Sequence, residues 1–328
     1  KKPLFVFGGG AAHAWEVARQ VVAVWGAASM TSYAGRGIIK GDAPLHFGAC
    51  LARGESATVL GEADLVIAVG TELAEVDIWR PHLGHTADLV RVDLDPEVLS
   101  DPQRASHPMQ AEAGAFLNAL VAHLPEEERK TGWRAEKVAA TRARWQAETN
   151  AERPGIVPIC EALREAVPVD TMIYSDMTQF AYVAKEVWDM DLPGHWHHPY
   201  GFGTLGYATP AAVGGAVARR GKPTMAIIGD YGFHYTMQEL GVAVELGLSL
   251  PIILWDNGKL GEIEDSMVRA QIAPNAVVAR NPDFVKLAEA FGARAVAPTN
   301  LAQMQEAVTA AFDAEGPTLI YLTPEILG

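Results

Sequence analysis

The chain has 328 residues, of which 49% are hydrophobic, and 40 acidic residues against 26 basic ones give it a formal net charge of −14. This length allows two domains of ordinary size, and the negative charge argues against nucleic acid and against a polybasic membrane contact. No apolar run approaches the roughly 20 residues of a membrane-spanning helix, no signal peptide is visible, and two cysteines make no disulfide framework. We therefore expect a soluble, cytoplasmic α/β protein.

Short apolar runs rich in valine and isoleucine alternate with longer amphipathic segments. The expected strands, in chain order, are Leu4–Phe7, Leu65–Val69, Leu89–Asp93, Met172–Ser175, Thr224–Ile228, Pro251–Trp255 and Leu319–Leu322. The expected helices are Ala14–Trp25, Glu161–Ala166, Ala211–Ala218, Met237–Leu246, Phe284–Phe291 and Leu301–Ala314. This alternation predicts parallel sheets whose strands are joined by right-handed crossovers.

The composition changes in the middle of the chain. Residues 125–155 are rich in charged side chains and poor in apolar ones, which is typical of a helical linker on a domain surface. We predict a first domain at residues 1–125, a charged helical linker at residues 126–154 and a second domain at residues 155–328.

The segment most indicative of function runs from Met225 to Gly261. An expected strand ends just before Asp230, which therefore lies at the carboxyl edge of a parallel sheet, where open α/β folds bind ligands. The next expected strand brings Asn257 to the same edge about 27 residues later. Carboxylate and amide oxygens suit Mg²⁺, and a helix expected to begin after Phe233 offers N–H groups to a diphosphate. We predict an Mg²⁺–diphosphate site; the alternative is an ordinary turn.

This pattern resembles the diphosphate motif of thiamine diphosphate enzymes, in which GDG is followed about 25–30 residues later by NN. Upstream, Gly203–Ala212 is similar to the GTMGFGLPAA stretch of acetolactate synthases and related 2-oxo acid decarboxylases. The chain departs from the motif at Tyr231, which replaces the glycine at the third position of GDG, and at Asp256, which replaces the first asparagine.

The resemblance implies which residues bind the cofactor. Asp230, the Asn257 side chain and the Lys259 carbonyl would ligate Mg²⁺, and Leu205 would lie under the thiazolium ring. The full implied set of cofactor-binding residues is Asp176, Gln179, Gly203, Thr204, Leu205, Gly229, Asp230, Tyr231, Gly232, Asn257, Lys259, Leu260 and Gly261.

The first half of the chain also resembles this family. Pro3–Ala11, Gly35–Gly48, Ala63–Thr71 and Val92–Pro96 are similar to parts of the central domain of acetolactate-synthase-like enzymes. The implied architecture is two three-layer α/β domains with mostly parallel sheets, a Rossmann-like central domain and a C-terminal domain that binds the diphosphate and Mg²⁺. In this family the central domain binds FAD or ADP or is empty, and the sequence leaves this open.

Two other features invite functional readings that we do not favour. Gly8–Gly10 is interpreted as a tight strand-to-helix turn, because His13 occupies the last glycine position of a GxGxxG motif. A nicotinamide-dependent dehydrogenase would rest on these glycines and the fold alone. The histidines of the second half are interpreted as part of a loop near an active-site mouth and not as a metal cluster. They are His195, His197 and His198.

The resemblance implies a third domain, which binds the aminopyrimidine ring, carries the activating glutamate and is missing here. Because the chain starts at Lys1, we expect a fragment of a longer polypeptide; the alternatives are one subunit of a split enzyme and a non-catalytic nucleotide-binding or assembly relative. The isolated chain is expected to be inactive, and its catalytic residues stay unassigned. The complete site is expected to form in a homo-oligomer, a dimer or a tetramer.

The implied reaction is the thiamine diphosphate- and Mg²⁺-dependent decarboxylation of a small-molecule 2-oxo acid. Carboligation of the acetolactate synthase type is the alternative. Three carboxylates within Gly261–Asp265 are interpreted first as a solvated acidic helix start. The alternative is that one of them faces the cationic tail of a guanidino or amino 2-oxo acid, with Glu262 and Glu264 as candidate contacts, which resembles decarboxylases of 5-guanidino-2-oxopentanoate.

Overall fold

The computed structural model describes residues 1–101, 103–124, 129–278 and 280–328. The chain divides into two compact units: unit 1 comprises Lys1–Glu148 and Asp189–Gly194, and unit 2 comprises Thr149–Trp188 and His195–Gly328. Within the described ranges, no helix is both long enough and apolar enough to cross a membrane. The start of the predicted linker, residues 126–128, lies outside the described residues, and the predicted domain limits stay a prediction.

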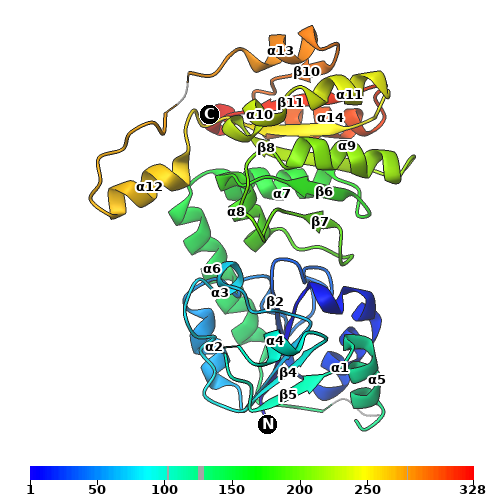
Figure 1. Cartoon of the computed structure of the whole chain (residues 1–328), viewed down its shortest axis with the longest axis vertical. Coiled ribbons are helices and arrows are strands. Elements are labelled where there is room, and N and C mark those ends of the chain that lie inside the picture. Colours follow the sequence, from blue (N-terminus) through cyan, green and yellow to red (C-terminus); the bar gives the residue numbers. More distant parts are fainter. Residues whose placement is uncertain (102, 125–128, 279) are drawn as a thin grey trace. The chain divides into compact units, whose positions relative to one another are not determined.

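Each unit is built on an all-parallel sheet, as predicted (Figure 1). Among the described residues, the sheet of unit 1 has five strands in the order β2-β1-β3-β4-β5. Their bounds are Pro3–Phe7 (β1), Ala28–Thr31 (β2), Leu65–Val69 (β3), Leu89–Asp93 (β4) and His107–Gln110 (β5). The two strands that the sequence analysis did not predict, β2 and β5, are the two edges of this sheet.

Helices cover both faces of the sheet of unit 1. Alternate residues of β1 point to opposite faces: Phe5 and Phe7 belong to a buried cluster with α1 and α5, whereas Leu4 and Val6 belong to one with α2 and α6. The helical segments of this part of the chain are Gly9–Ala14 (η1), Trp15–Trp25 (α1), Ser56–Glu62 (α2), Glu75–Ile78 (α3), Pro96–Leu99 (α4), Ala113–Val121 (α5) and Ala135–Glu152 (α6).

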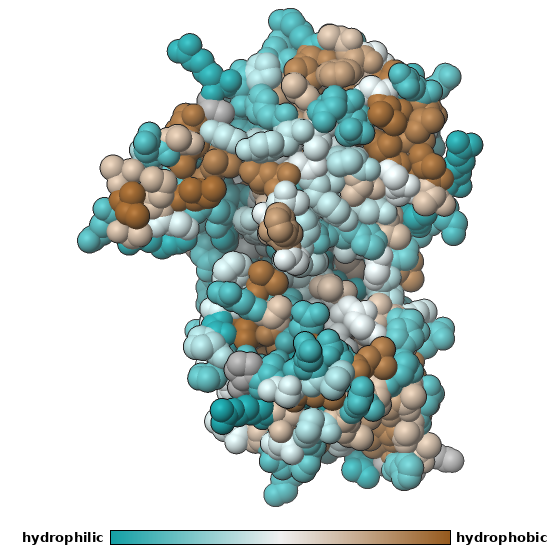
Figure 2. Space-filling model, viewed as in Figure 1, coloured by the Kyte–Doolittle hydropathy of each residue, from teal (hydrophilic) through white to brown (hydrophobic). Residues whose placement is uncertain are grey.

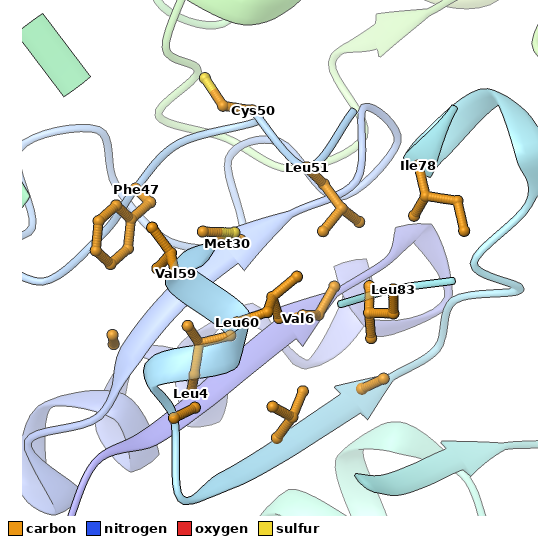
Figure 3. Packing of buried hydrophobic residues seen from close by; sticks show 14 of the residues in the cluster. Leu4, Val6, Met30, Phe47, Cys50, Leu51, Val59, Leu60, Ile78 and Leu83 are labelled. Atoms are coloured by element: carbon orange, nitrogen blue, oxygen red, sulfur yellow. The ribbon is translucent and has the colours of Figure 1, made fainter. Parts of the chain in front are cut away.

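The cluster beneath α2 is shown in Figure 3. Val59 and Leu60 of α2 point toward Leu4 and Val6 of β1 and Met30 of β2, and all five side chains are at most 5% exposed. Because these side chains come from strands and a helix far apart in the sequence, their burial fixes the helix onto the sheet.

The sheet of unit 2 has, among the described residues, six strands in the order β10-β11-β9-β8-β6-β7. Their bounds are Met172–Ser175 (β6), Trp196–His197 (β7), Thr224–Gly229 (β8), Pro251–Trp255 (β9), Arg294–Val296 (β10) and Thr318–Leu322 (β11). Again the strands that were not predicted, β7 and β10, are the edges.

Both faces of this second sheet are also buried. Ala226 and Ile228 of β8 pack in a cluster with α9, α10, α11 and α13, and the alternate residues Met225 and Ile227 are fully buried as well. Helix α7 packs against α8 and α14, and α8 and α14 contact the strands. The helical segments are Ile156–Ala166 (α7), Gln179–Val187 (α8), Ala208–Ala218 (α9), Asp230–Thr236 (α10), Glu239–Glu245 (α11), Gly261–Arg269 (α12), Phe284–Ala290 (α13), Leu301–Phe312 (α14) and Pro324–Leu327 (η2).

One helix start was predicted wrongly. The sequence analysis placed the helix of the diphosphate motif after Phe233, whereas α10 begins at Asp230 itself. Tyr231 in place of a glycine removes the most flexible residue of the motif, so the backbone enters the helix directly after Gly229, which is extended.

The Gly8–Gly10 turn packs directly against the end of β3. The Gly10 N–H donates to the Gly70 carbonyl at 3.0 Å, and a Cβ on Gly8 would lie 2.2 Å from the same oxygen. These glycines are needed for close contact between two turns of the sheet edge, which agrees with their interpretation as a tight strand-to-helix turn.

We expect Leu60→Ala to lower the free energy of unfolding of unit 1 by about 2–5 kcal/mol, because it leaves a cavity beneath α2. Urea unfolding followed by circular dichroism measures this loss. Leu94→Ala, at a position that is 66% exposed in the same unit, is the matched control and should change the value by less than about 0.5 kcal/mol. Equal effects of the two substitutions would contradict the packing shown in Figure 3.

Candidate diphosphate and cation site

The predicted site residues gather at the carboxyl edge of the sheet of unit 2. Gly229 of β8 pairs in register with Trp255 of β9, so the next residues, Asp230 and Asp256, leave neighbouring strands side by side. Asp176 follows β6, the neighbour of β8 on its other side. Asp230 is 3% exposed, Asp256 9% and Asp176 0%. Three buried carboxyl groups therefore lie at the ends of three adjacent strands.

One amide connects two of these carboxylates. Asn281 Nδ2 donates to Asp230 Oδ2 at 2.7 Å and to Asp256 Oδ1 at 2.8 Å. Burial, with a contribution from the neighbouring Asp256 carboxylate, raises the pKa of Asp230 to about 6. A carboxylate in such surroundings gains from a nearby cation.

Asn257 is held by a second predicted residue. Its Nδ2 donates to Gln179 Oε1 at 2.9 Å, and its Oδ1 accepts a long hydrogen bond of 3.3 Å from the Lys259 N–H. The Asn257 oxygen thus retains acceptor capacity, as a metal ligand requires. Gly261 lies against Gln179, because a Cβ there would be 2.6 Å from Oε1.

Asp176 holds the turn that precedes α9. Its two carboxylate oxygens accept the N–H groups of Gly206 at 2.8 Å and Tyr207 at 3.2 Å. A Cβ on Gly232 would lie 1.9 Å from Asp176 Oδ2, so the glycine one position after Tyr231 makes room for this carboxylate. The second glycine of GDG is thus displaced by one residue, to Gly232, where it leaves room for Asp176.

The remaining residues of the predicted set lie around these contacts. Gly203 has a φ of +66°, which favours glycine, and Thr204 is exposed whereas Leu205 and Tyr231 are half-buried. The Leu260 N–H donates to the Val277 carbonyl at 2.8 Å. The position of Leu205 beneath a thiazolium ring stays a prediction.

The carboxylates of α12 are partly neutralised inside the protein. Glu262 forms a two-pronged ion pair with Arg153 at 2.7 and 3.0 Å, and Glu264 accepts from Lys259 Nζ at 2.6 Å. Asp265 is exposed, and its Oδ2 lies 3.4 Å from Gln179 Nε2. The two glutamates predicted as substrate contacts therefore already have cationic partners.

The three histidines of the second half have other surroundings. The His195 carbonyl accepts the Ile173 N–H at 2.8 Å, and the His197 ring stacks on Tyr174. His198 Nδ1 lies 2.9 Å from Ser175 Oγ, and its Nε2 lies 3.3 Å from Lys185 Nζ. Throughout the described residues, no three His, Cys, Asp or Glu side chains gather as a metal site would need.

The sequence analysis missed three residues of this site. Asn281, Arg153 and Tyr321 contribute an amide, a guanidinium and a phenol, and none of them belongs to the quoted motif. Of these three, only Tyr321 could have been noticed in the sequence, because its hydroxyl group lies within the apolar run of an expected strand. Asn281 and Arg153 are brought in by connections whose course the sequence does not reveal.

Comparison with known proteins shows which family the chain resembles. Residues 1–120 match the model of the thiamine pyrophosphate enzyme central domain, and residues 176–322 match the thiamine pyrophosphate enzyme C-terminal TPP binding domain. Thiamine pyrophosphate is the same compound as thiamine diphosphate. Both matches agree with the resemblance found from the motifs.

Individual relatives span nearly the whole chain. The chain is 38% identical over 98% of its length to a protein of Pseudomonas aeruginosa named "Probable 2-ketoarginine decarboxylase", and it covers 58% of that protein. It is 27% identical over 98% of its length to the acetolactate synthase isozyme 2 large subunit of Escherichia coli, covering 60%. It is 28% identical over 97% of its length to the acetolactate synthase large subunit of Pyropia yezoensis, and it covers 56% of that protein. The chain thus spans somewhat more than half of these relatives.

Asp176 predicts a measurable pH dependence. Burial raises its pKa to about 6, from 3.8, so between these pH values the folded chain binds a proton more tightly than the unfolded chain. The contribution of Asp176 to stability is therefore fully present below about pH 4 and is lost as the pH rises through 6, by about 3 kcal/mol at most.

Urea unfolding of wild type and Asp176→Asn from pH 4 to 7 measures this loss. The free energy of unfolding of the wild type, minus that of the variant, should fall as the pH rises. Asp170→Asn, at an exposed carboxylate of the same unit, should give a flat difference. A flat difference for Asp176→Asn as well would contradict the assignment.

Proposed function

We propose that this chain, which belongs to the thiamine pyrophosphate enzymes, carries the diphosphate- and cation-binding part of an enzyme that decarboxylates a 2-oxo acid. The observation that carries the proposal is the meeting of Asp230 and Asp256-Asn257 at the ends of paired strands, within the residues that match the TPP binding domain. The relative of Pseudomonas aeruginosa named as a 2-ketoarginine decarboxylase supports the type of reaction.

The residues present fit a divalent cation with hard oxygen ligands. The Asp230 carboxylate, the Asn257 amide oxygen and the Lys259 carbonyl are donors of the type that Mg²⁺ prefers, and phosphate oxygens and water would complete its shell. The buried, adjacent carboxylates Asp230 and Asp256 favour positive charge at this edge.

When bound, thiamine diphosphate supplies the electron sink that makes loss of CO₂ from a 2-oxo acid feasible. The residues of this chain bind and orient it. Asp176 holds the turn before α9 through the N–H groups of Gly206 and Tyr207, and Gln179 fixes the amide of Asn257. These contacts preorganise the site before the cofactor arrives.

The complete enzyme is proposed to include a pyrimidine-binding domain, in the same or another chain, which supplies the activating glutamate. We also propose a homo-oligomer, since in this family the two halves of the site come from different subunits. Carboligation is the second candidate reaction, favoured by the similarity to acetolactate synthases. Product analysis separates the two, because decarboxylation ends at an aldehyde and carboligation at a 2-hydroxy-2-acyl acid.

The substrate is proposed to carry a cationic tail. Arg153 and Lys259 already neutralise Glu262 and Glu264, so the carboxylate we favour for the substrate cation is Asp265. It is exposed, and it lies beside Gln179, which contacts Asn257. A guanidinium group at this position would gain a charge-assisted hydrogen bond.

Replacing Asp230 tests the cofactor part of the proposal. In the complete enzyme, Asp230→Ala should reduce CO₂ release by at least about 100-fold and abolish Mg²⁺-dependent binding of thiamine diphosphate, because a charged ligand is lost. Isothermal titration calorimetry measures the binding. Asp170→Ala is the exposed control, and a variant at Asp230 that binds normally would refute the site.

Replacing Asp265 tests the substrate part. Asp265→Asn should lower kcat/KM for 5-guanidino-2-oxopentanoate by about tenfold, the equivalent of about 1.4 kcal/mol for one charged hydrogen bond. Its kcat/KM for 2-oxooctanoate, a substrate of similar length with a neutral tail, should change less than about twofold. A wild type that prefers the neutral acid, or a variant that loses both activities equally, would show that Asp265 does not select the cation.

A further inference from the structure

Asn281 lies outside the quoted motif and yet joins the two carboxylates at its centre. It lies three residues before the start of α13, and its Nδ2 donates to Asp230 Oδ2 at 2.7 Å and to Asp256 Oδ1 at 2.8 Å. A single amide nitrogen has two hydrogen atoms, so these two bonds use its full donor capacity. Asn281 thus ties the end of β8 to the end of β9.

The orientation of the Asn281 amide follows from its neighbours. Its Oδ1 lies 3.1 Å from Nε2 of His234 in α10. The opposite orientation would place this oxygen against two carboxylate oxygens, where every group is an acceptor. The hydrogen-bond pattern therefore permits one orientation, in which the nitrogen faces the carboxylates.

Asp256 is itself fixed by other donors. Its Oδ1 accepts the Gly258 N–H at 2.8 Å, and its Oδ2 accepts the Tyr321 hydroxyl of β11 at 2.8 Å. With Asn281, three donors hold this carboxylate, which is 9% exposed. We therefore interpret the Asp256 carboxylate as an anchor for its neighbours. To bind a metal ion, it would have to give up some of these hydrogen bonds.

We propose that Asn281 is a positioning residue for the cation ligand Asp230, and that Asp256 and Tyr321 hold Asn281 in place. The proposal rests on the proposed function, since it assumes a divalent cation bound by Asp230. In this arrangement Asp256 stays outside the coordination shell and keeps one oxygen of Asp230 oriented through the Asn281 amide. Partners of this kind change metal affinity by about 10–100-fold in other proteins.

The test is the binding of Mn²⁺ by the complete enzyme, stripped of cofactor and supplied with thiamine diphosphate. Electron paramagnetic resonance of free Mn²⁺ gives its Kd, and thermal unfolding without metal gives the Tm. Asn281→Ala should raise the Kd by about tenfold, and Tyr321→Phe, which removes one hydroxyl one step further away, by about threefold. These readouts do not depend on catalysis.

Asn300→Ala is the matched control. Asn300 caps α14 by accepting the Gln303 N–H at 3.0 Å, so its loss should lower the Tm in the same unit without changing the Kd for Mn²⁺. An unchanged Kd in Asn281→Ala would overturn the positioning role while leaving the proposed function intact. If Asn281→Ala does not fold, an unchanged Kd in Tyr321→Phe overturns it. A wild type without saturable Mn²⁺ binding overturns both proposals.

Discussion

Two buried carboxylates that leave neighbouring strands side by side impose the main constraint on this structure. The parallel register of β8 and β9 makes Asp230 and Asp256 neighbours, and a low-dielectric position makes two such charges costly unless donors or a cation surround them. The surrounding residues supply these donors. Asn281 lies between the two groups, Tyr321 reaches in from the next strand, and the N–H of Gly258 completes the set. The divalent cation of the proposed function would neutralise this sheet edge further.

The third buried carboxylate, Asp176, explains how the chain tolerates its departure from the GDG pattern. In the structure the glycine that the site needs is Gly232, whose missing side chain leaves room for the Asp176 carboxylate. Tyr231 can occupy the preceding position because the backbone there is already helical and the ring is only half-buried. The glycine requirement thus belongs to the contact with Asp176 and not to the position directly after Asp230.

The central strands could be predicted from the sequence and the edge strands could not. Strands β3 and β9 are continuous apolar runs because both of their faces are buried. The predicted limits of β3, β4, β6 and β9 are those of the structure. The edge strands carry a weaker signal: β5 is exposed along its whole length, β7 has two residues and β10 three. Of the four edge strands, only β2 is fully buried, but its sequence ASMT has no apolar run. Asn281 escaped prediction for another reason, since its role depends on where a long connection returns.

The acidic residues of α12 show how a charge pattern alone misleads. Ile263 and Val268 of this helix are 50% and 58% exposed, and Figure 2 shows brown and tan atoms among teal ones in the region of α12. Since its only buried residue is Gly261, hydrophobic packing contributes little to holding it in place. The Arg153–Glu262 and Lys259–Glu264 pairs supply contacts that packing does not. Two of the three carboxylates that the sequence analysis considered for a cationic substrate therefore form ion pairs within the protein, and Asp265 is the one proposed to contact the substrate.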